Sequence, residues 1–310
     1  MNREFFKKYK SIIGLILFSI IISIFNKDFL TVNNILNILR QTSINSIIAA
    51  GMTFVVLTGG IDLSVGSILA FSGAVCISMV SAGFSVFLAV IVALIIGSII
   101  GILNGIFISK GKLQPFIATL ATMTIVRGAT LVFTDGRPIT SGGSKGAQAF
   151  RNIGAGYFLK IPIPIYIMVI VFLLSYYLLK HMKFGRYVYS LGGNEEATKL
   201  SGINVDKVKI FVYGISGFLA ALAGIVMTSR LSSAQPNAGV GYELDAIASV
   251  VLGGTSLTGG VGSVLGTIVG ALIIGIINNA LNLMNVSSYY QTMVKGIVIL
   301  LAVLLDRKND

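Results

Sequence analysis

Residues 86–108 read VFLAVIVALIIGSIIGILNGIFI, a run of 23 residues without a charged side chain. A helix of about 20 predominantly apolar residues spans the hydrocarbon core of a bilayer. The run therefore predicts a membrane-spanning helix, and the rest of the chain repeats the pattern. Further apolar runs lie at residues 11–25, 44–58, 63–80, 115–133, 161–179, 209–229, 246–258, 261–281 and 291–305.

The composition agrees with a polytopic membrane protein. Of the 310 residues, 55% are hydrophobic and only 11% are charged, and the mean hydropathy is +0.91. A soluble domain carries about 25% charged residues, so this chain lacks the polar surface to face water on all sides. We expect an all-α transmembrane helix bundle that forms a single domain over residues 1–310, with about ten spans. Eight spans with two re-entrant segments are the alternative, because residues 44–58 and 246–258 are short for full spans.

The distribution of Lys and Arg predicts the topology. The basic start of the chain leads into an apolar run without a small-residue cleavage pattern, so we interpret this run as a retained first span. With ten alternating crossings, the expected cytoplasmic segments carry 14 Lys and Arg and the expected outer segments carry 6. This bias follows the positive-inside rule and places both termini in the cytoplasm. The net charge of +12 thus indicates topology, and we expect no nucleic-acid partner.

Two loops are long enough to carry function. Residues 134–160 are rich in Gly and Ser and are expected outside, whereas residues 180–209 are the most charged stretch and are expected inside. In the second loop, Asn194 is followed by two acidic residues, which favour a helix N-terminus through the helix dipole. Gly202 is a plausible end for this helix. A short exposed helix between two spans has the shape of a docking element.

An internal repeat is visible in the sequence. Residues 55–60 and 65–67 (VVLTGG, VGS) resemble residues 250–254 and 261–263 (VVLGG, VGS). Transporters often contain repeats whose broken helices lie near the substrate route, although small residues also recur in any packed membrane helices. Glycines spaced by four allow close helix packing, within one subunit or between two. They are Gly97, Gly101 and Gly105, and Gly262, Gly266 and Gly270.

Polar residues in or beside the apolar runs are candidates for a pathway or a gate. Asp62 lies between two runs, where it can cap the next helix or take part in gating. Glu243 and Asp245 allow the same two interpretations. Four asparagines can line a pathway or form hydrogen bonds across helices. They are Asn104, Asn278, Asn279 and Asn282.

The motifs of enzymes are missing. The sequence contains no HExxH, no GxSxG and no GxxxxGK[ST] phosphate loop, and residues 142–145 (GGSK) fall short of the last of these. We therefore expect no catalytic residues and no ATP hydrolysis by this chain. Cys76 has no second cysteine to pair with and is expected to be a small apolar filler, and His181 is expected to be solvated. We expect no cofactor and no metal site.

Four blocks of the sequence resemble a known family. They are GMTFVVLTGGIDLSVGS (51–67), LGGNEEATKLSGI (191–203), SSAQPNAGVGYELDAIASVVLGGTSLTGG (232–260) and VSSYYQTMVKGIVILLAVLLD (286–306). Together they resemble the permeases of bacterial binding-protein-dependent ABC sugar importers, over residues 28 to 306. Within this family the resemblance favours ribose as the sugar. Permeases for galactose, xylose or the furanose-like autoinducer share the GGIDLSVGS block, so that block alone does not select the sugar.

The resemblance implies a mechanism. Two permease copies form the pathway in the bacterial cytoplasmic membrane, surrounded by lipid. A cytoplasmic subunit binds ATP and Mg, and an extracytoplasmic binding protein delivers the sugar. The docking element for the ATPase would be residues 191–203, notably Gly192, Gly193, Asn194, Glu195 and Glu196. The alternative is an ion-coupled carrier or channel for a small polar solute, with Asp62 as its best coupling residue.

Overall fold

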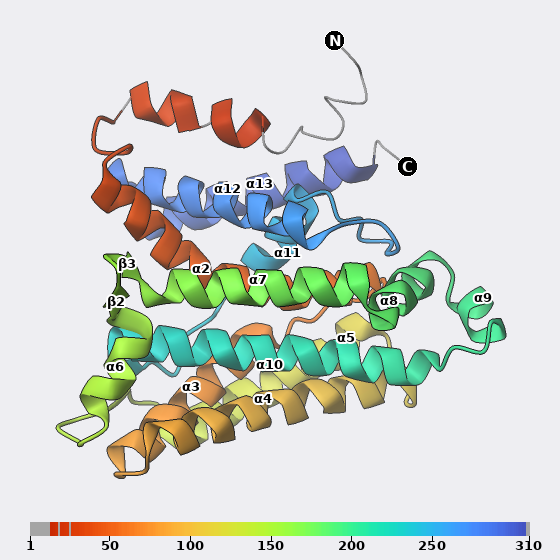
Figure 1. The fold of residues 1–310 in the computed structure, drawn as a ribbon, viewed down its shortest axis with the longest axis horizontal. Helices are drawn as coiled ribbons and strands as arrows, with labels where there is room; N and C mark the ends of the chain where they lie inside the picture. The colour runs from red at the N-terminus through yellow and green to blue at the C-terminus, as the bar shows by residue number, and fades with distance from the viewer. Residues whose placement is uncertain (1–12, 18, 25, 308–310) are drawn as a thin grey trace.

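The computed structural model describes residues 13–17, 19–24 and 26–307. Arg3, Lys7, Lys8 and Lys10, which support the prediction of a cytoplasmic N-terminus, lie outside the described residues, as do parts of the run 11–25. After a first helical stretch, the long helices lie side by side along one direction (Figure 1). The helices are α2 (Val32–Leu57), α3 (Val65–Ser81), α4 (Val86–Ser109), α5 (Pro115–Thr134), α6 (Ala147–Ala155), α7 (Ile163–His181), α8 (Lys183–Gly193), α9 (Glu195–Leu200), α10 (Val205–Leu231), α11 (Tyr242–Leu252), α12 (Val264–Leu283) and α13 (Ser288–Arg307).

The fold is an all-α membrane bundle, as expected. Five of the described helices, α4, α5, α7, α10 and α12, are long and apolar enough to cross a bilayer. Their outer faces carry exposed apolar side chains, such as Phe87, Ile125, Val132 and Leu173. Extended apolar surface of this kind marks contact with a membrane or with another protein.

Two of the expected apolar runs differ in extent from their helices. The run 44–58 is only the second half of α2, whose 26 residues extend about 39 Å at 1.5 Å per residue. The helix begins at Val32 because Thr31 caps it, accepting a hydrogen bond from the Asn34 N–H. Much of the expected outer segment 26–43 is therefore helix, including Arg40. The helix of the run 246–258 is short, as expected, because α11 ends at Leu252.

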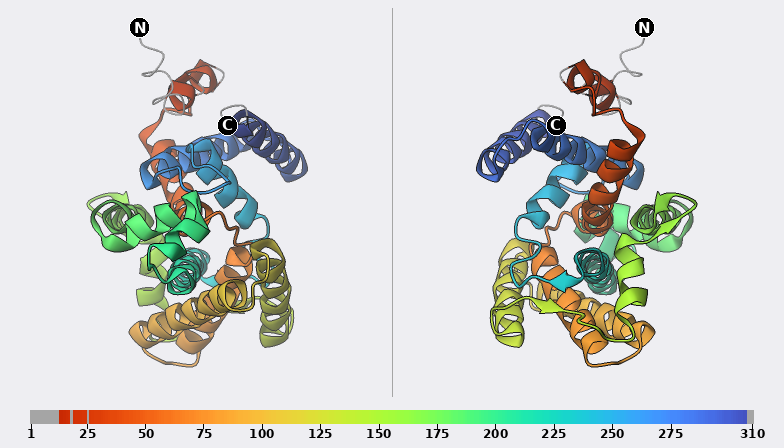
Figure 2. Two further views of the ribbon diagram at one scale, coloured as in Figure 1. Left: turned by 90° about the vertical axis from the view of Figure 1, so that its right-hand side faces the viewer. Right: turned by 90° about the vertical axis from the view of Figure 1, so that its left-hand side faces the viewer.

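Helix α10 lies at the centre of the bundle, in contact with α2, α3, α4 and α6 (Figure 2). Gly97 and Gly101 of α4 lie against the backbone of α10 at Gly217, which shows that these glycines pack helices within one subunit. The expectation of three glycines on one face of α12 was wrong for Gly262. That residue lies in the loop before the helix, with a φ of 149°.

The internal repeat is present in the backbone. At the end of α2, the Gly60 N–H donates to the Val55 carbonyl and the Gly59 N–H donates to the Val56 carbonyl. At the end of α11, the Thr255 and Gly254 N–H groups donate to the carbonyls of Val250 and Val251. Both pairs form a Schellman motif, and Gly59 and Gly254 take the positive φ that this motif requires. The two segments therefore share a helix, a glycine break and a second helix.

The two long loops are folded and lie at opposite ends of the bundle (Figure 1). Residues 134–160 contain α6 and the short strands β1 (Ile139–Thr140) and β2 (Tyr157–Phe158). Strand β2 pairs with β3 (Ile161–Pro162), which follows directly, and β1 pairs with β4 (Ser233–Ala234). Residues 180–209 contain α8 and α9. We call the end of the bundle that carries residues 134–160 the α6 end, and the end that carries residues 180–209 the α9 end.

Candidate functional site

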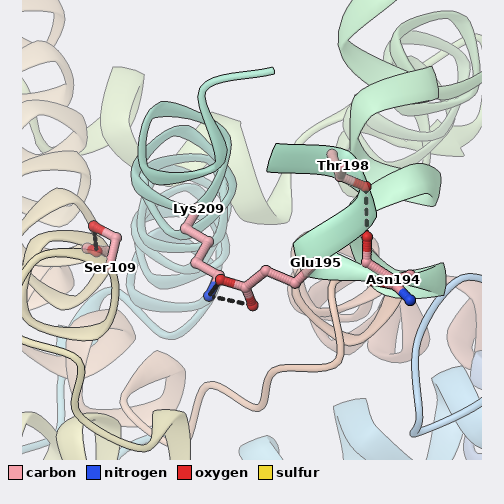
Figure 3. A network of polar contacts seen from close by, with 6 residues as sticks. Ser109, Asn194, Glu195, Thr198 and Lys209 are labelled. Carbon is pink, nitrogen blue, oxygen red and sulfur yellow. Dashed lines mark hydrogen bonds and ion pairs between the residues drawn. The ribbon is translucent and has the colours of Figure 1, made fainter. Parts of the chain in front are cut away.

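Helix α9 begins and ends where the sequence indicates. The Asn194 side-chain oxygen accepts the Ala197 N–H at 2.9 Å, which satisfies one of the free donors of the first turn. The Thr198 hydroxyl donates to the Asn194 carbonyl at 2.7 Å (Figure 3). Gly202 follows the last turn with a φ of 81°. The sequence did not indicate the separate helix α8, which precedes α9.

An ion pair fixes α9 to α10. The Lys209 ammonium lies 2.7 Å from both carboxylate oxygens of Glu195, and the two side chains point toward one another from the two helices (Figure 3). The Lys209 side chain is 16% exposed and that of Glu195 is 53% exposed. Glu196 is exposed, and Leu200 is 89% exposed. Helix α9 therefore presents a carboxylate and an apolar side chain on its outer surface.

Three glycine-containing segments meet at the α9 end, in what we call the glycine junction (residues 57–60, 192–193 and 259–260). A Cβ added to Gly192 would clash with the Leu57 carbonyl and with the Gly260 nitrogen. The Gly260 N–H donates to that same carbonyl at 3.0 Å. A Cβ at Gly193, in contrast, would meet nothing within 4 Å. The end of α8 therefore contacts the glycine break after α2 and the loop that joins α11 to α12.

A cavity of about 660 Å³ lies beside α9 and the glycine junction. Its walls come from the break after α2, the end of α4, and the start of α10. Among the lining residues are Thr58, Ser109, Lys199, Asp206 and Tyr213. The cavity is bordered by the charged residues of α9 and α10, including Glu195 and Lys209.

Asp62 is fully buried at the centre of a polar network. One carboxylate oxygen accepts hydrogen bonds from the Ser64 N–H at 3.0 Å and the Ser64 hydroxyl at 2.6 Å, and the other accepts from the Ser216 hydroxyl at 2.7 Å. Asn104 donates to Ser64, and Thr122 donates to Asn104. The network joins the loop before α3 to α4, α5 and α10. Asp62 thus fixes the turn before α3 rather than capping a helix at Leu63, because the helix starts only at Val65.

The acidic residues of α11 have separate partners. Glu243 accepts the Gly241 N–H at 3.1 Å, at the start of the helix. Asp245 forms an ion pair with Lys295 of α13 at 2.8 Å, with side chains 8% and 28% exposed. Arg127 of α5 donates at 2.8 Å to two carbonyls of the segment before α11, those of Pro236 and Ala238.

No role was expected from the sequence for Lys209, Arg127 or Lys295. The sequence did contain an indication for Arg127 and Lys295. Each is a cation within an apolar run, where an unpaired charge is costly.

The four candidate asparagines fall into two groups. Asn104, Asn279 and Asn282 form hydrogen bonds with other segments: Asn104 with Ser64 and Thr122, Asn279 with Asn34 on α2, and Asn282 with Gln291. The pair between Asn279 and Asn34 is reciprocal, at 2.9 and 3.0 Å. The Asn278 side-chain oxygen is buried without a hydrogen-bond partner among the described residues. Other atoms of Asn278 line a cavity of about 160 Å³.

Two further residues lie where the sequence indicates. Cys76 is a buried free thiol on α3, packed in an apolar cluster with Ile77, Val80 and Phe150. His181 ends α7 and is exposed, stacked against Tyr177 with ring centroids 5.5 Å apart.

A bundle of apolar helices with buried polar networks, paired helices joined by glycine breaks and a short helix exposed at one end is the arrangement expected of a membrane transport subunit. The family described as the permease component of the branched-chain amino acid transport system matches residues 34–303, and the chain belongs to this family. It is thus a multi-pass membrane permease, a transport component rather than an enzyme.

Named relatives match along the whole chain. The chain is 61% identical to the ribose import permease protein RbsC of Haemophilus influenzae over 98% of this chain and 94% of the relative. The identity is 59% to the protein of the same name from Bacillus subtilis, over 98% and 94%, and 55% to that from Escherichia coli K12, over 100% and 98%. No solved structure matches the chain.

Proposed function

We propose that this chain is the membrane-spanning subunit of an ABC importer and forms the translocation pathway for ribose. The observation that carries the proposal is the full-length identity of 55 to 61% to permeases named for ribose import. A resemblance confined to one block, such as GGIDLSVGS, would support only the assignment to sugar importers and would not select the sugar. Here the identity extends over both repeat units and both ends of the bundle.

A separate ATPase subunit drives the transport, with ATP and Mg bound by that subunit. The docking element on this chain is α9 with the preceding residues, namely Gly192, Gly193, Asn194, Glu195 and Glu196. Three features support this assignment: the exposed Glu196 and Leu200, the ion pair that fixes α9 to α10, and the glycine junction. A displacement of α8 and α9 by the ATPase would reach the break after α2 and the loop between α11 and α12 through backbone contacts, without a flexible side chain in between.

The α9 end faces the cytoplasm, and the α6 end faces the extracytoplasmic binding protein. This orientation follows from the excess of Lys and Arg in the segments at the α9 end. The chain then crosses the bacterial inner membrane about ten times, with both termini in the cytoplasm. Helix α11 and the loop 253–263 together form one of these crossings, since α11 alone extends only about 16 Å.

Two copies of the chain form the complete pathway. The exposed apolar faces of the helices contact lipid or the second copy. An ion-coupled carrier is the second candidate, but Asp62 is enclosed by Ser64 and Ser216 and faces no cation in the network described above. No comparison supports that candidate.

Competition tests the proposed substrate. Cells that lack their own permease and express this chain with its ATPase and binding protein take up labelled ribose. Excess unlabelled ribose abolishes the signal, whereas equal amounts of galactose or xylose leave it unchanged. Competition by one of these sugars as strong as that by ribose would contradict the assignment of ribose.

A further inference from the structure

The hairpin of β2 and β3 at the α6 end carries exposed apolar side chains at its tip, residues 158–160 (Figure 1). We call these three residues the hairpin tip. Phe158 is 61% exposed, and Leu159, in the turn, is 77% exposed. Leu159 and Lys160 have φ values of 48° and 64°, as in a type I′ turn, where Asn and Gly are the usual residues. The turn therefore presents a large apolar side chain and a cation in place of small residues.

Neighbouring helices hold the hairpin on two sides. The Tyr166 hydroxyl, near the start of α7, donates to the Phe158 carbonyl at 3.0 Å, and the two rings meet edge to face with centroids 5.8 Å apart. The Arg40 guanidinium of α2 donates to the Tyr157 hydroxyl at 3.3 Å. The hairpin tip is thus held in a defined position and projects its exposed side chains away from these two contacts.

The hairpin tip continues the exposed apolar face of α7. Tyr166, Ile170, Leu173 and Tyr177 follow one another at spacings of four, three and four residues, so they share one face of the helix. The last three of these side chains are more than half exposed. Because Phe158 packs on Tyr166, the hairpin tip extends this face beyond the start of the helix.

The position of α7 in the bundle indicates what covers this face. Helix α7 lies on one flank, and α5 and α13 lie on the opposite flank (Figure 2). Those two helices carry the cations Arg127 and Lys295 within their apolar runs, whereas residues 163–179 of α7 contain no charged side chain. Charged groups at membrane depth face the interior of a protein or a polar route, and an uncharged apolar face suits lipid. The flank of α7 is therefore the lipid-facing one.

The length of α7 sets the depth of the hairpin. Its 19 residues extend about 29 Å, close to the ~30 Å of the hydrocarbon core of a bilayer. A helix that just spans the core places the residues before Ile163 at the level of the lipid headgroups. Aromatic side chains are enriched at this level, and a lysine there can reach a phosphate while its stem contacts apolar groups.

We propose that the hairpin tip anchors the start of α7 in the headgroup region of the bilayer. Phe158 and Leu159 contact the upper part of the acyl chains, and Lys160 lies near the phosphates. The partner of this surface is a phospholipid bilayer, and the binding protein and the second copy of the chain contact other surfaces. The proposed topology makes this the outer leaflet, whereas the lipid contact itself depends on neither the topology nor the transported sugar.

The chain contains no tryptophan, so one introduced Trp reports its own surroundings without background. The variant Leu159→Trp is reconstituted in proteoliposomes, and its fluorescence is quenched either with phospholipids brominated near the headgroup or with iodide in the buffer. Leu173→Trp, on the exposed face of α7, is the lipid control. Gly143→Trp is the water control at the same end of the bundle, because a Cβ there meets nothing within 4 Å. Should Leu159→Trp fail to fold, Phe158→Trp is measured in its place.

We expect the brominated lipid to quench Leu159→Trp strongly, as it does Leu173→Trp, and iodide to quench it much less than Gly143→Trp. Quenching by iodide to the level of Gly143→Trp, without quenching by lipid, would place the hairpin tip in water and overturn the proposal. Protection from both quenchers would overturn it as well, since the tip would then be buried between two copies. Quenching by lipid in a chain that fails to transport ribose would support the anchor and count against the proposed function.

Discussion

Gly192 at the end of α8 packs directly against the carbonyl oxygen of Leu57, the last residue of α2. The same oxygen accepts the Gly260 N–H at 3.0 Å, so residues from three distant parts of the sequence meet at one atom. This contact connects the proposed ATPase dock with both repeat units of the membrane bundle. Backbone atoms in contact transmit a displacement with little loss, since no rotatable side chain lies between them.

The first prediction concerns this contact. Gly192→Ala forces a Cβ into the Leu57 carbonyl, and such overpacking costs about 1–3 kcal/mol of stability. We expect a lower Tm and a clear loss of ATP-driven uptake. Gly193→Ala is the matched control for stability, because a Cβ there meets nothing within 4 Å, and we expect it to keep the Tm of the wild type. Equal Tm and uptake for the two variants would show that the junction has room at position 192.

The second prediction separates the two acidic residues of α9. Replacing Glu195 and Glu196 together, with Ala and Arg, weakens ATPase binding and leaves membrane insertion intact. Of the single changes, Glu196→Arg has the larger effect on co-purification, because Glu196 is exposed and free to contact a partner subunit. Glu195→Ala removes a half-exposed ion pair that contributes about 1 kcal/mol or less. Undiminished co-purification of the ATPase with the double variant would argue against the dock.

The third prediction addresses the alternatives for Asp62. An amide at this position still accepts the two hydrogen bonds from Ser64, and the Ser216 hydroxyl can rotate to accept one from it. Asp62→Asn therefore keeps the Tm and the uptake close to wild type if the residue only fixes the turn. Asp62→Leu leaves buried donors unpaired, at about 1–3 kcal/mol each, and lowers the Tm. Impaired uptake by a stable Asp62→Asn variant would assign the acid to gating.

The fourth prediction concerns the ion pair between α11 and α13. Asp245→Asn leaves the partly buried Lys295 ammonium without its counter-charge, so we expect a lower Tm. Adding Lys295→Met removes the remaining charge, so the double variant recovers much of the lost Tm. A double variant as unstable as the single one would show that the pair is not the source of the effect.

The fifth prediction concerns orientation. Alkaline phosphatase is active only outside the cytoplasm, so a fusion to the C-terminus is expected to be inactive. A fusion within residues 142–145, at the α6 end, is expected to be active. Phosphatase activity of the C-terminal fusion would contradict the proposed topology.

The five helices long and apolar enough to cross a bilayer, such as α4 at 86–109, were predictable because each contains a long apolar run, and apolarity is a local property of the sequence. The start of α2 was not predictable in this way, since the first half of the helix is rich in Asn and carries Arg40. Those polar residues lower the hydropathy, although Asn34 bonds across to α12 inside the bundle. The repeat was visible in the sequence because Gly59 and Gly254 adopt a positive φ, which few other residues do.

The partners of the candidate residues were harder to predict. Asn278 and Asn279 are identical in type and adjacent in sequence, yet one lines a cavity and the other pairs with a residue 245 positions away. Pairing of this kind depends on helix rotation and on contacts distant in sequence. The capping of α9 by Asn194, in contrast, involves residues only three positions apart, and the sequence indicated it correctly.

The most direct measurement is labelled ribose uptake in permease-deleted cells that express this chain, with and without the cognate ATPase subunit, at equal levels of permease in the membrane. We predict uptake only when the ATPase is present. Uptake of equal rate without the ATPase would contradict it and identify an autonomous carrier.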